Sequence, residues 1–318
     1  MPRWTRRLLH IPAIWALVAA AGALLAQANP AWTTDFTAFR IAGNLYYVGS
    51  QDLASYLVVT PKGDILINSN LQSSVPQIKK SVESLGFKFT DIKILLISHA
   101  HYDHCAGSAE ILRLTGAKYY VMEGDVPVVE SGGRDDFQYA ANRSMWFTPA
   151  KVDRVLHDLD TVTLGGTALT ANLTAGHTKG TTTWTMDVTE AGKVEHVVIV
   201  GSPNVNPGYK LIGDLTYPQI ASDYARGFRV LRALRCDIFL GAHGSYFGLL
   251  EKYARWKRGD EDAFVDPKGY KAYIDEREQA FLIELRRQQS AALGGTADSQ
   301  PFGFVIVRPP GSAMAVEN

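Results

Sequence analysis

The chain has 318 residues, with 32 basic and 32 acidic side chains and a hydrophobic content of 46%. This apolar share is sufficient for a packed core, so the composition predicts a globular protein of one large domain or two smaller ones. Nucleic acid is not an expected partner, because the sequence carries neither a basic excess nor a basic stripe.

Residues 1–28 differ from the rest of the chain. Three arginines precede an apolar stretch over residues 11–26, and the stretch ends in small residues up to Ala28. This order is typical of a secretory signal peptide, so we predict cleavage after Ala28, a periplasmic location and no stable membrane association afterwards. A retained N-terminal anchor is the alternative, since the stretch approaches the length of a membrane span. Removal of residues 1–28 leaves 29 basic against 32 acidic side chains, a formal charge of −3.

The first half of the remaining chain is rich in short strands. Apolar and β-branched residues bounded by turn residues predict strands at 39–41, 45–48, 55–60 and 64–68. A helix is expected where Val75, Ile78 and Val82 recur at helical spacing. The other elements expected in this half are a buried strand at 92–97, a helix at 106–114, a strand at 118–122, a helix at 125–130 and an irregular segment at 132–149.

The second half repeats this pattern in outline. The expected elements are strands at 161–164, 168–173, 181–187 and 196–200, a helix at 218–234, a strand at 237–240, and helices at 249–256 and 268–289. Two halves that each begin with strands and then alternate helices with strands imply two sheets packed face to face with helices outside. We therefore predict an α/β protein, a four-layer αβ/βα sandwich over residues 29–292, with a loosely ordered C-terminal tail at 293–318.

The most informative stretch is Ser98 to Gly107, which reads SHAHYDHCAG and follows the expected buried strand. If the stretch is extended, side chains two positions apart point the same way, so His99 and His101 can share one metal ion. Asp103 and His104 can then reach a second. Imidazole and carboxylate are ligands that zinc accepts. The alternative interpretation is a polar surface loop whose histidines cluster by chance.

Two further histidines, His177 and His243, stand where an expected strand ends. Alone, each is more typical of an ordinary loop residue, but a two-metal site needs additional ligands, and the first motif therefore favours both. The only cysteines are Cys105 and Cys236. An oxidising compartment would permit a disulfide. However, Cys105 adjoins the expected metal loop, whereas an extended segment from Cys236 to His243 would place Cys236 roughly 20 Å from a metal ion bound by His243. The two cysteines would then be too far apart to bond, so we predict two unpaired thiols.

These motifs resemble those of metallo-β-lactamase-fold hydrolases, and most closely those of subclass B3 metallo-β-lactamases, over residues 39–289. The resemblance implies two zinc ions per chain. It assigns three ligands to the first zinc, namely His99, His101 and His177, and three to the second, namely Asp103, His104 and His243.

Ser202 favours subclass B3 within this family. Enzymes of subclasses B1 and B2 have a zinc-binding cysteine in this segment, and glyoxalase II and many lactonases have an aspartate there that bridges both metals. A serine can replace neither ligand. The segment from Asn206 to Leu211, followed by Tyr217-Pro218, is similar to B3 enzymes. One departure concerns Cys236, because some B3 enzymes join a cysteine there to another on the C-terminal helix. In this chain Tyr270 stands about where that partner would be, so the crosslink is expected to be missing.

The implied activity is zinc-dependent hydrolysis of the β-lactam amide of penicillins, cephalosporins and carbapenems, which confers antibiotic resistance. Hydroxide held between the metals would attack the carbonyl, and Asp103 would act as the catalytic carboxylate by orienting that hydroxide. A formal site charge of about +2 suits substrates that carry a carboxylate. Ser202, Asn204 and Asn206 are expected to bind that carboxylate or, alternatively, only to shape the following turn.

Other interpretations are kept beside this one. Tyr139 and Trp146 could line the pocket or pack locally. The protein could be another hydrolase on the same scaffold, acting on lactones, thioesters or sulfate esters, or a non-catalytic zinc-binding protein. Six available ligands favour an enzyme, because a binding module needs no open metal position. A serine mechanism is not expected, because no Ser-x-x-Lys segment stands in a matching context. We expect a monomer that acts on a small β-lactam.

Overall fold

The structure is a computed structural model that describes residues 29–293. The signal peptide expected at 1–28 and the tail from residue 294 onward lie outside the described residues. Among residues 29–293, no helix is both long enough and apolar enough to cross a membrane.

Two sheets form the centre of the molecule. The first has seven strands that lie side by side in chain order: β1 (Phe39–Ala42), β2 (Leu45–Tyr47), β3 (Tyr56–Val58), β4 (Asp64–Ile67), β5 (Ile92–Leu96), β6 (Lys118–Met122) and β7 (Arg154–Leu156). The second has the order β12-β11-β10-β9-β8 and contains β8 (Asp160–Leu164), β9 (Thr167–Leu173), β10 (Thr182–Glu190), β11 (Lys193–Val200) and β12 (Ile238–Gly241). Hairpins make β1 to β4 and β8 to β11 antiparallel, whereas β4 to β7 and the pair β11 and β12 are parallel.

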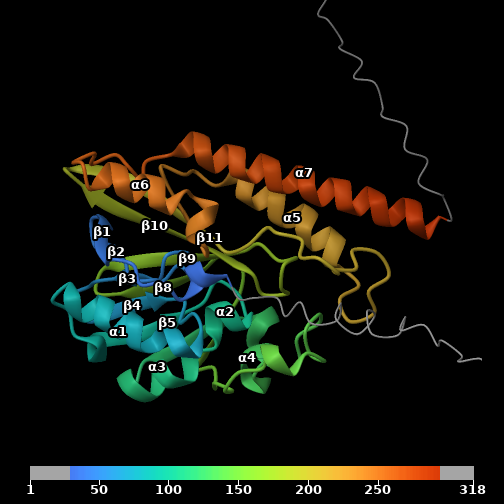
Figure 1. Cartoon of the computed structure of the whole chain (residues 1–318), viewed down its shortest axis with the longest axis horizontal. Helices are drawn as coiled ribbons and strands as arrows, with labels where there is room; N and C mark the ends of the chain where they lie inside the picture. Colours follow the sequence, from blue (N-terminus) through green and yellow to red (C-terminus); the bar gives the residue numbers. More distant parts are fainter. Residues whose placement is uncertain (1–28, 294–318) are drawn as a thin grey trace, which may run out of the picture.

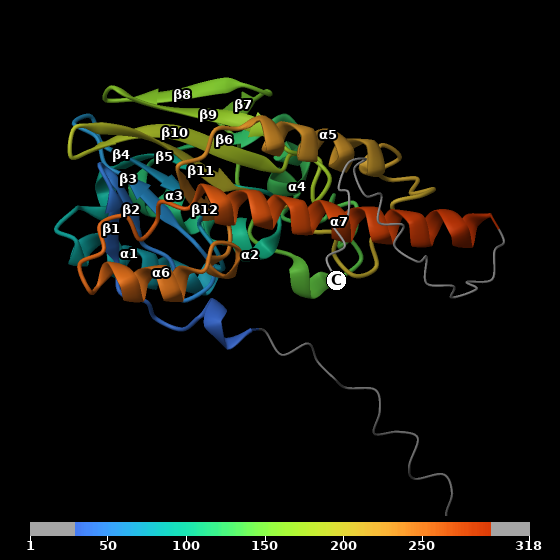
Figure 2. The same ribbon diagram turned by 90° about the horizontal axis from the view of Figure 1, so that it is seen from above.

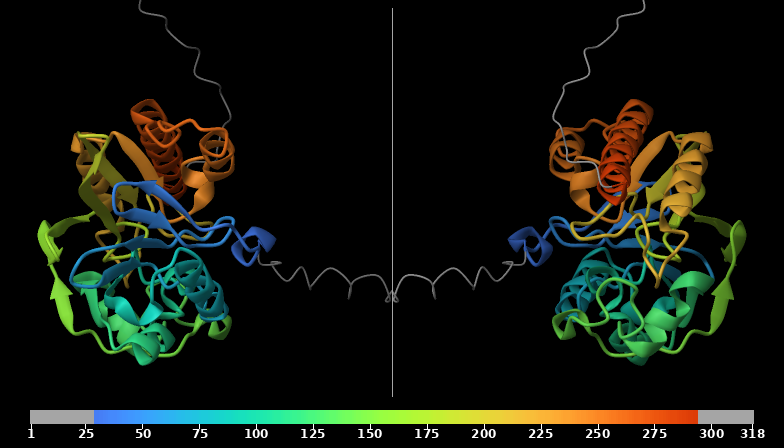
Figure 3. Two further views of the ribbon diagram at one scale, coloured as in Figure 1. Left: turned by 90° about the vertical axis from the view of Figure 1, so that its left-hand side faces the viewer. Right: turned by 90° about the vertical axis from the view of Figure 1, so that its right-hand side faces the viewer.

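Helices cover the outer faces of both sheets (Figure 1). The helices beside the first sheet are α1 (Val75–Ser84), α2 (Tyr102–Cys105), α3 (Ser108–Thr115) and α4 (Val126–Ser131). Those beside the second sheet are α5 (Ile220–Ala233), α6 (Leu249–Trp256) and α7 (Pro267–Ala292). The end-on views in Figure 3 show the resulting order of helix, sheet, sheet and helix. The expected four-layer sandwich is confirmed.

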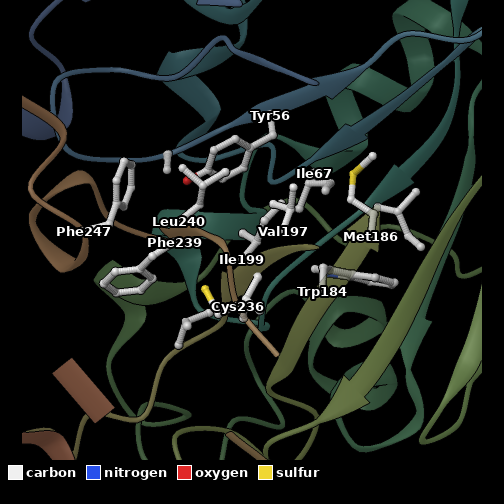
Figure 4. Close-up of a cluster of buried hydrophobic side chains, with 14 of the residues drawn as sticks. Tyr56, Ile67, Trp184, Met186, Val197, Ile199, Cys236, Phe239, Leu240 and Phe247 are labelled. Atoms are coloured by element: carbon white, nitrogen blue, oxygen red, sulfur yellow. The ribbon is translucent and has the colours of Figure 1, made fainter. Parts of the chain in front are cut away.

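The strands β4 and β5 are mostly apolar because both of their faces are largely buried, and Lys93 on β5 is the one exposed residue of the two strands. Side chains alternate across a strand, and Ile65 and Ile67 accordingly face the core between the sheets. Leu66 faces the opposite way, into a second core against α1 and α3. Figure 4 shows the core between the sheets, where Ile67 lies near Trp184 and Met186 of β10. Burial on both faces holds β5 rigidly in the place from which the SHAHYDH stretch departs.

Two hydrogen bonds cross between the sheets close to the histidine loops. The indole Nε1 of Trp184, on β10, donates to the carbonyl oxygen of Ile97 at 3.0 Å, directly before the SHAHYDH stretch. The hydroxyl of Tyr56, on β3, donates to the carbonyl oxygen of Gly241 at 2.7 Å, two residues before His243. Both donors are fully buried, so loss of either bond would leave a buried polar group unpaired. These bonds therefore set the relative position of loops that lie far apart in the sequence.

Both cysteines are buried and unpaired, as predicted. Burial raises the pKa of the Cys236 thiol to about 12, so this thiol is inert at neutral pH. Cys236 and Tyr270 line one cavity of about 270 Å³ between the end of α5 and α7. The Tyr270 hydroxyl donates to the carbonyl oxygen of Leu231 at 2.6 Å. A hydrogen bond thus ties α7 to α5 in the region where some relatives are expected to have a disulfide.

Strand β7 was not expected, and its burial explains why. Only the last of its three residues is buried, so the segment shows no apolar alternation. It forms a strand because it pairs in parallel with β6 at the sheet edge. The segment 132–149 is irregular as expected, apart from a 3-10 turn at Arg143–Met145.

Candidate active site

The candidate metal ligands converge from three loops, those that follow β5, β9 and β12. Strand β5 ends at Leu96, the chain bends at Ser98, Ala100 and His101, and α2 begins at Tyr102. The carbonyl oxygen of His101 accepts hydrogen bonds from the N–H groups of His104 and Cys105, which close one helical turn. The expectation of an extended segment through His104 is therefore wrong. The turn carries Asp103 and His104 and brings the ring of His104 to 4.3 Å from that of His99.

The first three candidate ligands, His99, His101 and His177, form one cluster. One ring nitrogen of each lies within 4.8 Å of the others. All three side chains are buried. Burial lowers the pKa of His99 and His177 well below the ordinary value, helped by the neighbouring imidazoles. The rings are therefore neutral at pH 7 and have lone pairs available for a metal ion.

The second three, Asp103, His104 and His243, converge equally closely. Nε2 of His104 lies 3.2 Å from Oδ2 of Asp103 and 3.1 Å from Nε2 of His243. Nε2 of His243 lies 3.5 Å from the same Asp103 oxygen. A tetrahedral zinc ion with bonds of about 2.1 Å places its ligand atoms about 3.4 Å apart. The three contacts therefore match the spacing around one zinc ion.

The two clusters adjoin each other. His99 also lies within 4.8 Å of ligand atoms of Asp103 and His104, so it stands between the two sets. Burial works to raise the pKa of Asp103, but the charges and hydrogen bonds of His104 and His243 outweigh it and hold the pKa well below the ordinary value. Asp103 is thus an ionised carboxylate beside the imidazoles of His104 and His243. This set of donor atoms fits two zinc ions.

Three of the histidines are oriented by groups behind them. Nδ1 of His243 lies 3.0 Å from Oδ2 of Asp52, and Nδ1 of His177 lies 2.7 Å from the carbonyl oxygen of Asn204. Nε2 of His101 lies 3.4 Å from the hydroxyl of Tyr209, and the buried carboxylate of Asp136 is close by at 3.6 Å. Such partners select the tautomer and direct the other ring nitrogen toward the metal. Sequence reasoning missed the two aspartates, because no local spacing relates Asp52 to a histidine 191 positions away.

Asp125 joins the first two loops. Its buried carboxylate accepts hydrogen bonds from the N–H of Ala100 at 2.8 Å, the hydroxyl of Thr178 at 2.9 Å and the N–H of Gly180 at 2.8 Å. Ala100 stands between His99 and His101, and Thr178 follows His177. One side chain therefore holds all three candidate ligands of the first zinc in register. Asp125 is the first residue of the helix predicted at 125–130, but nothing in the sequence indicated these partners.

Replacement of Asp52 by asparagine is expected to weaken binding of the second zinc by about 10- to 100-fold, the usual cost of losing the carboxylate behind a metal-bound histidine. Burial works to raise the pKa of Asp52, but His243 and the N–H of Ser245 outweigh it and hold the pKa at about 2. The side chain is therefore a charged acceptor at neutral pH. Zinc titration against a coloured chelator measures the change.

Asp35→Asn is the matched control, because Asp35 is 69% exposed and pairs with Lys80 at the surface. Its zinc affinities should equal those of the unaltered protein. Equal affinities in Asp52→Asn as well would contradict the orienting role of Asp52.

Five of the six candidate ligands, all except His99, line a cavity of about 370 Å³. Aromatic side chains form much of its wall, and Asp136 and the amides of Asn204 and Asn206 add polar groups. Its aromatic lining residues other than histidine are Trp32, Tyr102, Tyr139, Phe147 and Tyr246.

Only two of the three expected substrate-binding residues lie in the cavity wall. Asn204 and Asn206 line the cavity, but Ser202 does not: it is buried, and its Oγ lies 3.2 Å from the hydroxyl of Tyr246. Tyr139 lines the cavity, and its hydroxyl accepts a hydrogen bond from Asn206 at 3.0 Å. Trp146 packs locally, with its indole N–H donating to the carbonyl oxygen of Ala140.

The comparisons with known proteins agree with this geometry. The family described as "Metallo-beta-lactamase superfamily" matches residues 53–243. The native FEZ-1 metallo-beta-lactamase from Legionella gormanii is 56% identical with a TM-score of 0.80, and the match covers 81% of this chain and 98% of that one. BJP-1, a subclass B3 metallo-beta-lactamase of Bradyrhizobium japonicum, is 36% identical with a TM-score of 0.77, covering 82% of this chain and 98% of that one.

A third similar structure is the class B3 di-zinc metallo-beta-lactamase LRA-12 from an Alaskan soil metagenome. It is 39% identical with a TM-score of 0.77, and the match covers 81% of this chain and 97% of that one. Identities at this level over nearly the whole length of the relatives show common descent and not merely a common fold. The chain therefore belongs to the metallo-β-lactamase superfamily and, within it, to the subclass B3 metallo-β-lactamases.

Proposed function

We propose that this protein is a dizinc β-lactam hydrolase that opens the amide of penicillins, cephalosporins and carbapenems and so confers antibiotic resistance. The observation that carries the proposal is the convergence of six candidate ligands, five of which line a cavity of about 370 Å³. The cavity is of the size typical for small-molecule sites. The similarity to subclass B3 enzymes supports the same activity.

The residues that would hold the metal ions follow from the two clusters. His99, His101 and His177 would hold the first zinc, and the second would be held by Asp103, His104 and His243. Zinc, when bound, lowers the pKa of a coordinated water from about 15.7 towards 7 and polarises the amide carbonyl. Asp103 lines the cavity and is ionised, so its carboxylate can accept a hydrogen bond from the attacking water and orient it.

The cavity wall provides the substrate contacts. Tyr139, Phe147 and Tyr246 give it apolar surface for the body of a β-lactam. Asn204 and Asn206 carry amide N–H groups that can donate to the substrate carboxylate. Ser202 acts indirectly in this proposal, since its hydroxyl contacts Tyr246 and not the cavity.

The test is hydrolysis of a penicillin, a cephalosporin and a carbapenem by the purified protein, with zinc content measured on the same sample. A chelator should abolish turnover of all three, because the water then loses its activating charge. Added zinc should restore turnover at two equivalents per chain. A lactone, a thioester and a sulfate ester are assayed in parallel. Turnover of one of these in place of the β-lactams would overturn the proposal, as would full activity without zinc.

Export to the periplasm is a further part of the proposal, supported by the order of arginines, apolar residues and small residues in 1–28. The protein isolated from a periplasmic extract should begin at Asn29 and behave as a monomer. An intact N-terminus at Met1 in the membrane fraction would favour the retained anchor instead. Mass spectrometry of both fractions distinguishes the two outcomes.

A further inference from the structure

Asn204 connects a candidate zinc ligand to the outer surface of the molecule. Its carbonyl oxygen accepts hydrogen bonds from Nδ1 of His177 at 2.7 Å and from the hydroxyl of Tyr224 at 2.6 Å. Its backbone is therefore fixed. Its side chain lies between the hydroxyl of Tyr246, 2.8 Å from Nδ2, and the guanidinium of Arg277, whose Nη1 lies 3.4 Å from Oδ1.

Arg277 reaches Asn204 from outside the active-site cavity. It belongs to α7, which runs along the outer helical layer (Figure 2). A second cavity of about 520 Å³ lies between this helix and the loop at 204–208, and Asn204 lines both cavities. Arg277 is 29% exposed, lies over the ring of Tyr273 and pairs with Glu276. The loop therefore separates Arg277 from the substrate.

The contacts of the Asn204 amide decide which of its ends can face the substrate. An amide has an acceptor oxygen and a donor NH2 group, and a tyrosine hydroxyl can pair with either. Tyr246 alone therefore leaves the two orientations of the amide equivalent. A guanidinium has only donors, so Arg277 can hydrogen-bond to the Asn204 amide only when Oδ1 faces the guanidinium. The NH2 group must then lie on the side of Tyr246, which lines the active-site cavity.

We propose that Arg277 is a positioning residue that makes the site selective for anionic substrates by holding the Asn204 amide with its NH2 group on the cavity side. This inference rests on the proposed function. A carboxylate can only accept hydrogen bonds, so the reversed amide would present an oxygen to it and repel it. Because Glu276 pairs with Arg277, the guanidinium acts through the orientation of the amide and not through a long-range field.

The test compares Arg277→Met with Arg287→Met in steady-state hydrolysis of a penicillin. Arg287 lines the same outer cavity and is also a cation, but its guanidinium hydrogen-bonds to Glu284 and, within residues 29–293, forms no hydrogen bond to Asn204. Arg277→Met should raise KM about tenfold with kcat within about twofold, the expected cost of a lost hydrogen bond to a charged group. Arg287→Met should leave both constants unchanged. Arg277→Gln replaces Arg277→Met if the latter does not fold.

Two further measurements separate orientation from a structural effect. In an Asn204→Ala background, Arg277→Met should add no further rise in KM, because the two residues act through one contact. The methyl ester of the penicillin, measured as a competitor of the free acid, should bind the unaltered protein and Arg277→Met equally. The inference is overturned if KM is unchanged in Arg277→Met or rises equally in Arg287→Met. It is also overturned if Arg277→Met raises KM fully in the Asn204→Ala background, or if the ester loses as much affinity as the free acid. Absence of β-lactam hydrolysis by the unaltered protein overturns the proposed function, and this inference with it.

Discussion

Replacement of His101 by alanine is expected to lower kcat/KM for a carbapenem by about a thousandfold, more than the 10- to 100-fold loss typical of a residue behind a ligand. His101 lies in the first cluster and lines the cavity, so the variant loses a ligand and not only an orienting group. Zinc content after dialysis should fall from two ions to about one. Steady-state kinetics and metal analysis on one sample measure both changes.

His157→Ala is the control for this variant. His157 is 62% exposed, lies 3.3 Å from Glu123 and does not line the cavity. Its replacement removes the same imidazole without touching either candidate metal cluster, so kinetics and zinc content should be unchanged. Full activity of His101→Ala with two bound zinc ions would contradict the assignment of His101 as a zinc ligand.

Replacement of Asp103 by asparagine is expected to lower kcat by about 10²- to 10³-fold, within the range for loss of a group that handles the reacting proton. The substitution keeps the size of the side chain and removes its charge. The pKa of Asp103 is held well below the ordinary value by His104 and His243, so the lost charge is present in the unaltered protein at every pH near neutrality. Stopped-flow hydrolysis of a cephalosporin, at saturating zinc, measures the effect on turnover.

The matched control for this variant is Asp135→Asn, which removes the same charge from an exposed site on the segment beside the cavity. We expect its kcat to equal that of the unaltered protein. Saturating zinc is needed because Asp103 is also a candidate ligand, and a weaker second site would otherwise imitate a loss of catalysis. A kcat for Asp103→Asn within about twofold of normal, with two zinc ions bound, would exclude the orienting role.

Most of the fold could be predicted because its signals are local. The apolar runs at β4 and β5 and the helical spacing of Val75, Ile78 and Val82 depend on residues that are neighbours in the chain. Strand β7 could not be predicted, because its residues do not alternate between apolar and polar and the segment becomes a strand only by pairing with β6. The turn at α2 was missed for a related reason. Four residues closed by hydrogen bonds to His101 are too short to show a helical period.

The site divides in the same way. By itself, the sequence determined the six candidate ligands, because a metal requires particular donor types and these stand at strand ends in a recognisable spacing. Only the tertiary structure decided which groups stand behind them. Asp52 contacts His243, Asp136 lies near His101 and Arg277 contacts Asn204, in each case from a separate element of the fold. It also decided that Asn204 and Asn206 face the cavity while Ser202 is buried. Hydrogen bonds between distant segments exist only after the sheets have packed, and no short-range pattern in the chain encodes them.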